Sequence, residues 1–346
     1  MKLYQLGDLP GFDSMLAFHA MAHLGMEGFV IVSPQEPIAS VGYFQDPDTS
    51  IDMKYCKENA IGVMRREVGG GTTLLDRNQI FYQVILKKSN PFLPLDPLML
   101  YRKFSQPVID TYKEIGINAK FKEVNDIITE EGRKITGEGG TNIGDTVVFV
   151  GGVLLDFDSD TMSKILPASS EQYRIKILQS LKNNLTTVKR ELGKNPDKKY
   201  IEKKLIGNFE KLLGPFENAE LTAEVWSKAR ELEKYYTSQE FLWKKSRKIS
   251  GVKIASEVNV FEKRYKAVGG TIHVIYETKG ELLNSVNIYG DFTMLPKEEL
   301  GELEKQLIGL PLDKQQIQES MKKFFEKSEA ECPGVSPSDF AEVFFS

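Results

Sequence analysis

Two arginines followed by three glycines are the most distinctive group of residues in the chain. They belong to a run that continues through threonines and leucines to an acid: Met64, Arg65, Arg66, Glu67, Val68, Gly69, Gly70, Gly71, Thr72, Thr73, Leu74, Leu75 and Asp76. Glycine backbone approaches a ligand closely and aims N–H groups at phosphate oxygens, while arginine adds a permanent positive charge. The run therefore indicates a cradle for an anion. On these residues alone, a flexible hairpin tip beside an incidental basic pair is an equally good explanation.

A lysine among glycines forms a second candidate group further along the chain. Asn125 and Asp126 precede the run Gly132-Arg133-Lys134-Ile135-Thr136-Gly137-Glu138-Gly139-Gly140. Lys134 lies in a short β-like segment flanked by glycines, which would hold one ammonium group rigidly beside a ligand that approaches the backbone. Such a lysine suits an acyl-phosphate centre. The alternatives are a surface lysine on a hairpin and, for Asp126, an acid in a turn.

Short strands and two helices in the first 160 residues would have to position these groups. Runs rich in β-branched and aromatic residues predict strands at 28–32, 39–43, 62–66, 79–86, 120–123, 126–129, 133–137 and 146–155. Helices are predicted at 13–24 and 96–115, the second because Leu100, Phe104, Val108 and Tyr112 recur at helical spacing. This mixture predicts an α+β domain.

From residue 169 to residue 245 the pattern is wholly helical. One apolar stripe contains Leu178, Leu181, Leu185, Val188 and Leu192, and a second contains Ile201, Leu205, Phe209 and Leu212. We expect these helices to pack on the preceding sheet.

The last hundred or so residues return to a strand pattern. Strands are predicted at 258–265, 270–277 and 282–289, with hairpin turns at Gly269-Gly270 and Lys279-Gly280, and helices at 297–308 and 314–325. A polar segment at 244–251 precedes them, so we place a boundary near Gly251. The chain would then comprise a large unit, residues 1–247, and a small α+β unit, residues 252–346.

The overall composition argues against several classes of protein. The 346 residues carry a formal charge of −4, which argues against general binding of nucleic acid, and the apolar runs are too short to span a membrane. The first residues lack the apolar segment of a signal peptide, so we expect a cytoplasmic protein. Cys56 and Cys332 have no partners at metal-binding spacing, and His19 and His23 lack a third ligand. The glycine run is neither a P-loop nor a dinucleotide-binding fingerprint.

The order of the motifs resembles that of the lipoate-protein ligases, and the resemblance covers nearly the whole chain. RRxxGGG is followed by Asn125-Asp126 and by GRKxxG, as in that family. Further segments that resemble the family, in order, are Val41-Gly42-Tyr43-Phe44-Gln45, Gly152-Val153-Leu154-Leu155 with Asp158, Tyr236 to Trp243, Gly270 to Val274, Ile288 to Phe292 and Leu303 to Gly309. The last three resemble the accessory domain of these ligases.

The resemblance implies a biotin/lipoate ligase-like catalytic domain with a large mixed sheet and helices in residues 1–247. It also implies a small α+β accessory domain, the ligase C-terminal domain, in residues 252–346. Lipoate, or an octanoate-like acid, would react with ATP in the presence of Mg²⁺ to form an acyl-adenylate. The acyl group would then pass to a lysine of an acceptor protein. That acceptor would be a lipoyl domain of a 2-oxoacid dehydrogenase E2 subunit, a glycine cleavage H protein or a similar protein. The adenylate-binding residues would be Arg65, Arg66, Gly69, Gly70, Gly71, Thr72, Thr73, Leu74, Asn125, Asp126 and the catalytic Lys134, and the metal ligands are open.

Several positions depart from the family pattern. Val68 stands where the family usually has Ser, and Leu75 stands where it has His. The small Ser-Ala pair after GRKxxG is Glu138-Gly139, and the His and Thr of the family's HGTLL strand are Gly151 and Val153. Glu138 could pair with Lys134 and compete with a phosphate, point outward, or help hold magnesium.

Two other functions fit the same resemblance. An acyl transferase of this fold takes octanoyl or lipoyl groups from a carrier through a cysteine thioester without ATP, and it needs a nucleophilic cysteine near Lys134. Neither Cys56 nor Cys332 occupies that region of the sequence. A non-catalytic lipoyl-protein assembly factor is the second alternative, and the retained Arg66, GGG and Lys134 argue against it.

Overall fold

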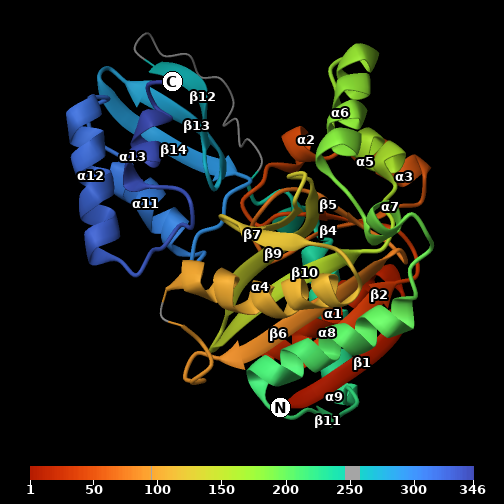
Figure 1. Cartoon of the computed structure of the whole chain (residues 1–346). Coiled ribbons are helices and arrows are strands. Elements are labelled where there is room, and N and C mark those ends of the chain that lie inside the picture. Colours follow the sequence, from red (N-terminus) through yellow and green to blue (C-terminus); the bar gives the residue numbers. More distant parts are fainter. Residues whose placement is uncertain (95, 246–257) are drawn as a thin grey trace.

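The computed structural model describes residues 1–94, 96–245 and 258–346. Figure 1 shows a large unit, which contains the N-terminus, and a smaller C-terminal unit beside it. The boundary that we placed near Gly251 lies outside the described residues, so the division at 247 and 252 stays a prediction. No described helix is long and apolar enough to cross a membrane.

One mixed sheet organises the large unit. Its strands lie in the order β11-β1-β2-β6-β10-β9-β8-β7. Their bounds are Glu217–Asn218 (β11), Lys2–Leu9 (β1), Gly28–Pro34 (β2), Gln79–Lys87 (β6), Thr146–Leu154 (β10), Lys134–Ile143 (β9), Asp126–Thr129 (β8) and Ala119–Lys122 (β7). β1 runs parallel to both of its neighbours, and the other pairs are antiparallel. The α+β fold with a large mixed sheet, predicted from the sequence, is confirmed.

Helices cover both faces of this sheet. On one face lie α4 (Pro97–Glu114) and α8 (Lys198–Leu213), whose Phe104, Val108 and Phe209 share a core with Tyr82 of β6. On the other lie α1 (Gly11–His23) and α9 (Ala223–Tyr236), which pack on Val30 and Ile85. Successive residues of β6 alternate between the two cores, as the pleat of a strand requires.

A second sheet of three short strands carries the arginine motif. Its order is β4-β3-β5, with bounds Gly62–Arg65, Ile38–Val41 and Thr73–Leu75. The helices α2 (Pro47–Ser50), α3 (Met53–Glu58), α5 (Ser159–Ile165) and α10 (Gln239–Leu242) belong to the same unit. The two arginines and three glycines therefore occupy the end of β4 and the connection from β4 to β5.

The stripe from Leu178 to Leu192 does not form one helix. α6 (Glu171–Asn184) ends before Leu185, and α7 (Val188–Leu192) begins after the extended Thr187. α6 has no buried residue, and Figure 1 shows it projecting from the large unit. The expectation that all these helices pack on the sheet is therefore wrong for α6, whereas α8 buries Ile201, Leu205 and Phe209 as expected.

The C-terminal unit is a meander of three antiparallel strands covered by helices. The strands are β12 (Val258–Ala267), β13 (Gly270–Lys279) and β14 (Leu282–Gly290), and the helices are α11 (Glu299–Leu307), α12 (Lys314–Lys327) and α13 (Pro337–Glu342). Alternate residues of β13 are buried against these helices. The sequence predicted these three strands and the first two helices, but it did not reveal α13. Residues 258–346 are called the module below.

Candidate functional site

The glycine run and the Lys134 strand meet at one cavity of about 310 Å³. All but two of the residues expected to bind the adenylate line it: Arg66, Gly69, Gly70, Gly71, Thr72, Thr73, Leu74, Asn125 and Lys134. Asp126 instead lines an adjoining crevice together with Lys134. Arg65 lines neither space.

Arg65 is completely buried, and its side-chain N–H groups donate to backbone carbonyls. Nη1 donates to the carbonyls of Gly42, Tyr43 and Gln45 at 2.9, 2.8 and 2.8 Å, and Nε donates to the carbonyl of Leu242 at 3.1 Å. Burial lowers the pKa of Arg65 to about 10. Arg65 therefore joins the loop after β3 to α10, which corrects the expectation that both arginines face the ligand.

Arg66 fixes the shape of the glycine turn. Its guanidinium donates to the carbonyl of Ser40 at 2.9 Å and to those of Gly69 and Gly71 at 2.7 and 2.8 Å. Burial, with a smaller effect of the nearby Arg65 charge, lowers the pKa of Arg66 to about 10. Arg66 lines the cavity, but much of its hydrogen-bonding capacity is used by the turn itself.

The glycine turn is packed on both sides, so it is not a flexible hairpin tip. Gly70 has a φ of +85°, which favours glycine. A Cβ at Gly42 would lie 1.8 Å from the carbonyl oxygen of Gly70, and one at Gly69 would lie 2.5 Å from Oγ1 of Thr293 in the module. Thr72 anchors the end of the turn by donating its hydroxyl to a carbonyl of α2.

Lys134 and Asp126 face one another at the edge of the cavity. The Lys134 ammonium lies 2.5 Å from Oδ1 of Asp126, and both side chains are partly exposed. Asn125 donates from Nδ2 to the carbonyl of Glu138 at 2.6 Å, which ties the loop before β8 to β9. A Cβ at Gly137 would lie 2.9 Å from Nζ of Lys134, so this glycine leaves room for the lysine. The lysine is therefore held in place while its charge remains accessible to a ligand.

The inner wall of the cavity is apolar. It is formed by residues of α1, β6 and β10 and by the residue before the glycines: Met15, Phe18, Phe81, Val150 and Val68. A Cβ at Gly139 would lie 2.6 Å from Cγ1 of Val68, so Val68 packs directly on the bare strand. An apolar recess beside a turn of glycines and a lysine suits a hydrocarbon chain that ends in a carboxylate.

Glu138 lines the cavity, but its carboxyl group contacts Tyr82 and Ser105 of α4 and forms no ion pair with Lys134. Tyr82, Gly151 and Glu138 are neighbours in one row across β6, β10 and β9. A Cβ at Gly151 would lie 2.1 Å from the hydroxyl of Tyr82, which therefore passes over the bare glycine and donates to Oε1 of Glu138 at 2.8 Å. Oε2 contacts Ser105 of α4. The side chain forms none of the three arrangements considered from the sequence.

Burial favours the neutral form of Glu138. Oγ of Ser105 lies 2.6 Å from the carbonyl oxygen of Tyr101 and also contacts Oε2 of Glu138. The single hydrogen of the Ser105 hydroxyl is shared between two acceptors, the carbonyl of Tyr101 and Oε2 of Glu138. Burial raises the pKa of Glu138 to about 8, in spite of the hydrogen bonds from Ser105 and Tyr82. A neutral acid does not compete with a phosphate for Lys134.

A second buried glutamate, Glu67, joins the module to the large unit. Its carboxylate contacts Nζ of Lys297 in the module, Nε2 of His23 at 2.6 Å and the hydroxyl of Tyr236. Burial alone would raise the pKa of Glu67, but the hydrogen bond from His23 and the charge of Lys297 outweigh it and hold the pKa well below the usual range. The sequence gave no signal for this contact, because Lys297 lies 230 residues away.

The backbone of the module also contacts the glycine turn. The N–H of Gly70 donates to the carbonyl of Phe292 at 3.2 Å, and the N–H of Gly290 donates to the carbonyl of Phe44 at 2.9 Å. The rings of Phe44 and Phe292 stack with centroids 5.1 Å apart. The module therefore forms part of the environment of the turn.

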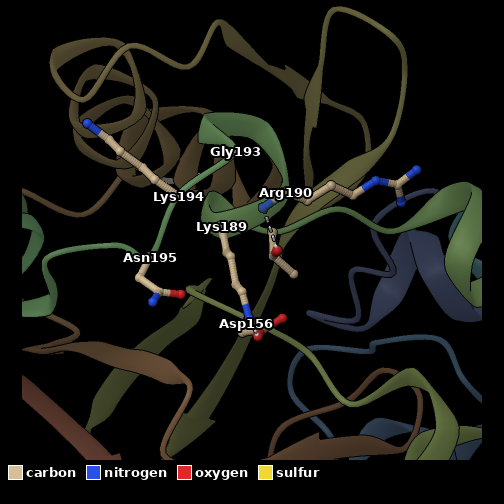
Figure 2. A pocket seen from close by; sticks show the side chains of 7 residues that line it. Asp156, Lys189, Arg190, Gly193, Lys194 and Asn195 are labelled. Carbon is tan, nitrogen blue, oxygen red and sulfur yellow. Dashed lines mark hydrogen bonds and ion pairs between the residues drawn. The ribbon is translucent and has the colours of Figure 1, made fainter.

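Another hollow of the surface lies at α7. It measures about 570 Å³ and is lined by Asp156, Lys189, Arg190 and Lys194 among others. Figure 2 shows Lys189 reaching Asp156, at 2.7 Å, while the side chains of Arg190 and Lys194 point away from this pair. Arg190 donates to carbonyls at the end of α6. The hollow contains none of the expected site residues.

The histidines and cysteines do not form a metal centre or a nucleophile. Within the described residues, no three His, Cys, Asp or Glu side chains gather as metal ligands. Nδ1 of His19 contacts the carbonyl of Met15, and burial lowers the pKa of His19 to about 4. Burial raises the pKa of Cys56 to about 11 and that of Cys332 further. Both cysteines are thiols at neutral pH, and neither lines the cavity.

Comparison with known proteins agrees with this geometry. The family model of the lipoyl protein ligase A/B catalytic domain matches residues 16–210. The chain belongs to the lipoyl protein ligase A/B family. A second family model, the bacterial lipoate protein ligase C-terminus, matches residues 255–344 of this lipoate ligase family member. The resemblance noted in the sequence is thereby confirmed for both parts of the chain.

Relatives of this family member carry two kinds of name. Octanoyltransferase LipM of Kyrpidia tusciae is 24% identical over 231 residues, which are 60% of this chain and 84% of that protein. Lipoate–protein ligase 1 of Staphylococcus aureus is 23% identical over 330 residues, 94% of this chain and 89% of that protein. The chain is thus an enzyme of the lipoate ligase and octanoyltransferase family, and the family alone does not decide between the two reactions.

A solved structure shares the fold. The bi-partite lipoate protein ligase of Thermoplasma acidophilum, whose structure was analysed with its E2 lipoyl domain, has a TM-score of 0.63 and 25% identity. The match covers 72% of this lipoate ligase family member and 98% of that chain. The architecture of the catalytic part is therefore that of a lipoate ligase.

Proposed function

We propose that this protein is an ATP-dependent lipoate–protein ligase that works through an acyl-adenylate. The observation that carries the proposal is the meeting of an apolar recess, a glycine turn and the Lys134 ammonium in one cavity. The recess would hold the hydrocarbon part of lipoate or of an octanoate-like acid. The turn and Lys134 would lie at its carboxylate and at the phosphate of the nucleotide.

The reaction would proceed in two steps. A carboxylate oxygen of lipoate attacks the α-phosphorus of ATP, and pyrophosphate leaves with the electron pair of the broken P–O bond. The amine of an acceptor lysine then attacks the acyl carbon, AMP leaves, and the nitrogen loses a proton. Lys134 would stabilise the negative charge at the phosphorus in the first step, and no side chain of the enzyme becomes acylated.

Magnesium would enter with ATP as part of the substrate. Carboxylate oxygens are the ligands that Mg²⁺ prefers, and it usually binds one or two of them together with phosphates. Asp126 and Asp291 line the crevice beside Lys134 and offer such oxygens. The chemistry of these two residues therefore fits a magnesium ion that accompanies the nucleotide.

The same proposal includes the division of the chain into two domains and the class of its acceptor protein. Residues 1–247 would form the catalytic domain and residues 252–346 the accessory domain. The acceptor would be a lipoyl domain of an E2 subunit, a glycine cleavage H protein or a similar protein. Support for such a partner comes from the Thermoplasma acidophilum ligase, which was studied with an E2 lipoyl domain.

The octanoyltransferase reaction is the second candidate, because several relatives carry that name. That reaction needs a thiolate next to the acyl group. Cys56 is buried in the core around β3 and α3, and Cys332 donates its thiol hydrogen to the carbonyl of Thr293. Both thiols are outside the cavity, which favours the ligase reaction.

The test is ATP–pyrophosphate exchange that depends on added lipoate. The ligase function predicts exchange with lipoate and none without it, and it predicts that Lys134→Ala lowers the rate roughly 100- to 1,000-fold in a folded protein. Cys56→Ser and Cys332→Ser should each retain exchange. Absence of lipoate-dependent exchange, together with octanoyl transfer that either serine variant abolishes, would replace the ligase with the transferase.

A further inference from the structure

The large unit provides few positive charges for a nucleoside triphosphate. Among the described residues that line the cavity and the adjoining crevice, the cationic side chains are Arg66, Lys134 and Lys266. Arg66 donates to carbonyls of the glycine turn, and Lys134 is paired with Asp126. Polyphosphate is strongly anionic and is normally bound by several lysines, arginines or metal ions. The third of these cations, Lys266, belongs to the module.

Lys266 lines the same crevice as Lys134, in the part that the module contributes. The crevice measures about 310 Å³, and its large-unit wall contains Gly70, Gly71 and Lys134. Its module wall contains Lys266 at the end of β12 and Asp291 after β14. The charged groups around Lys266 in this crevice are thus one lysine and two acids, Asp126 and Asp291.

Lys266 is available for a ligand in a way that Lys297, the other module cation at the junction, is not. Nζ of Lys266 lies 3.4 Å from Oγ1 of Thr271, and it forms no ion pair with a described residue. Lys297, in contrast, is buried and contacts the carboxylate of Glu67. At the junction, Lys297 therefore holds the module in place through Glu67, as Lys245 of the large unit does through Glu304, whereas Lys266 has no ion pair with a described residue.

We propose that Lys266 binds the β- and γ-phosphates of ATP, so that the module contributes a positive charge to the activation step. The inference rests on the proposed ligase function and assigns a specific residue of the module to it. Activation releases pyrophosphate, whereas the transfer step releases only AMP. Lys266 therefore matters for the first step and not for the second, because the polyphosphate is gone when the acceptor lysine attacks.

The experiment measures three quantities with the full chain and its Lys266→Ala and Lys266→Arg variants. They are the Kd of Mg-ATP by calorimetry, the KM for ATP in lipoate-dependent pyrophosphate exchange, and the rate of transfer from chemically made lipoyl-adenylate. Lys279→Ala is the matched control, because it removes the same charge from an exposed position at the far end of β13. We expect Lys266→Ala to raise Kd and KM roughly ten- to a hundred-fold and to leave transfer unchanged.

The outcomes separate a failure of the Lys266 phosphate site from a failure of the proposed ligase function. Lys266→Arg should restore most of the affinity, since it keeps the charge. If Lys266→Ala binds Mg-ATP as Lys279→Ala does, Lys266 has no role in phosphate binding. If the wild type binds Mg-ATP and depends on Lys266 but shows no lipoate-dependent exchange, the ligase function fails and the phosphate site stands. If the wild type does not bind Mg-ATP at all, both fail.

Discussion

Glu67 at the module junction and Glu138 on β9 are both buried acids, yet their charges differ. Glu67 is in contact with a lysine and a histidine, and its pKa is held well below the usual range. Glu138 is in contact with two hydroxyl groups, and burial raises its pKa to about 8. The comparison teaches that burial alone does not set the charge of an acid, because the partners decide whether the charged form is retained.

The largest expected effect is that of removing the charge of Glu67. Glu67→Gln leaves the buried Lys297 with only the longer contact to the exposed Glu298, at 3.9 Å, and breaking a buried pair costs about 3 to 5 kcal/mol of stability. Urea denaturation at pH 7 measures the loss. Glu217→Gln is the control, because it breaks the exposed pair with Lys2 and should have no measurable effect. Equal stability of the two variants would show that the Glu67 pair does not hold the structure together.

The two acids should also give opposite dependences of stability on pH. Glu67 has a lowered pKa, so its contribution is present above its unfolded pKa and is lost as the pH falls below about 4.3. Glu138 has a raised pKa, so its contribution is present below about 4.3 and is lost as the pH rises towards about 8, at about 1.4 kcal/mol per pH unit.

The alkaline half of this prediction can be isolated with Glu138→Gln. The amide resembles the neutral acid, since its oxygen accepts from Tyr82 and its NH₂ donates to Ser105. The difference in unfolding free energy between variant and wild type should therefore grow in favour of the variant from pH 5 to pH 8. A difference that does not change over this range would mean that Glu138 is already ionised at pH 5.

Tyr82→Phe should have an intermediate effect. It deletes one hydroxyl and leaves Oε1 of Glu138 without its donor in a buried place, which costs roughly 1 to 3 kcal/mol. Thermal or urea unfolding at pH 6 measures it. A loss near zero would indicate that a water molecule replaces the hydroxyl over Gly151.

The smallest expected effect is that of Glu138→Gln at pH 5, where burial keeps the carboxyl group of the wild type protonated. Because every hydrogen bond can be kept, the change in unfolding free energy should stay within about 1 kcal/mol. A much larger loss at this pH would contradict the neutral form of Glu138 that burial favours.

The sequence predicted the elements that depend on local pattern. The strands around the arginine motif and the Lys134 run, and the helix with Leu100, Phe104 and Val108, all formed, because alternation and helical periodicity are local properties. The prediction from periodicity failed for α6, because the apolar stripe continues across a break in the helix at Leu185. Periodicity cannot show whether a face is covered, since that depends on the tertiary arrangement.

The sequence predicted most of the residues that meet at the cavity, but not the contacts that each of them makes. Arg65 and Arg66 are adjacent in one motif, yet they bind different segments. Arg65 donates to carbonyls of the loop after β3, whereas Arg66 donates to carbonyls of the glycine turn. Side chains of successive residues in a strand point in opposite directions, so adjacency in a motif does not imply a shared ligand. The contact of Lys297 with Glu67 and the place of Lys266 depend on how the module docks, for which the sequence has no local signal.

The row Tyr82–Gly151–Glu138 constrains how this protein can change by mutation. A side chain at position 151 would collide with the phenol, so it becomes acceptable only after Tyr82 has been replaced by a smaller residue. Replacing Tyr82 first removes a donor from Glu138 and is harmful by itself. The three positions are therefore epistatic. A histidine at position 151, as in the usual family pattern, is reachable from this sequence only through a destabilised intermediate or through simultaneous substitutions.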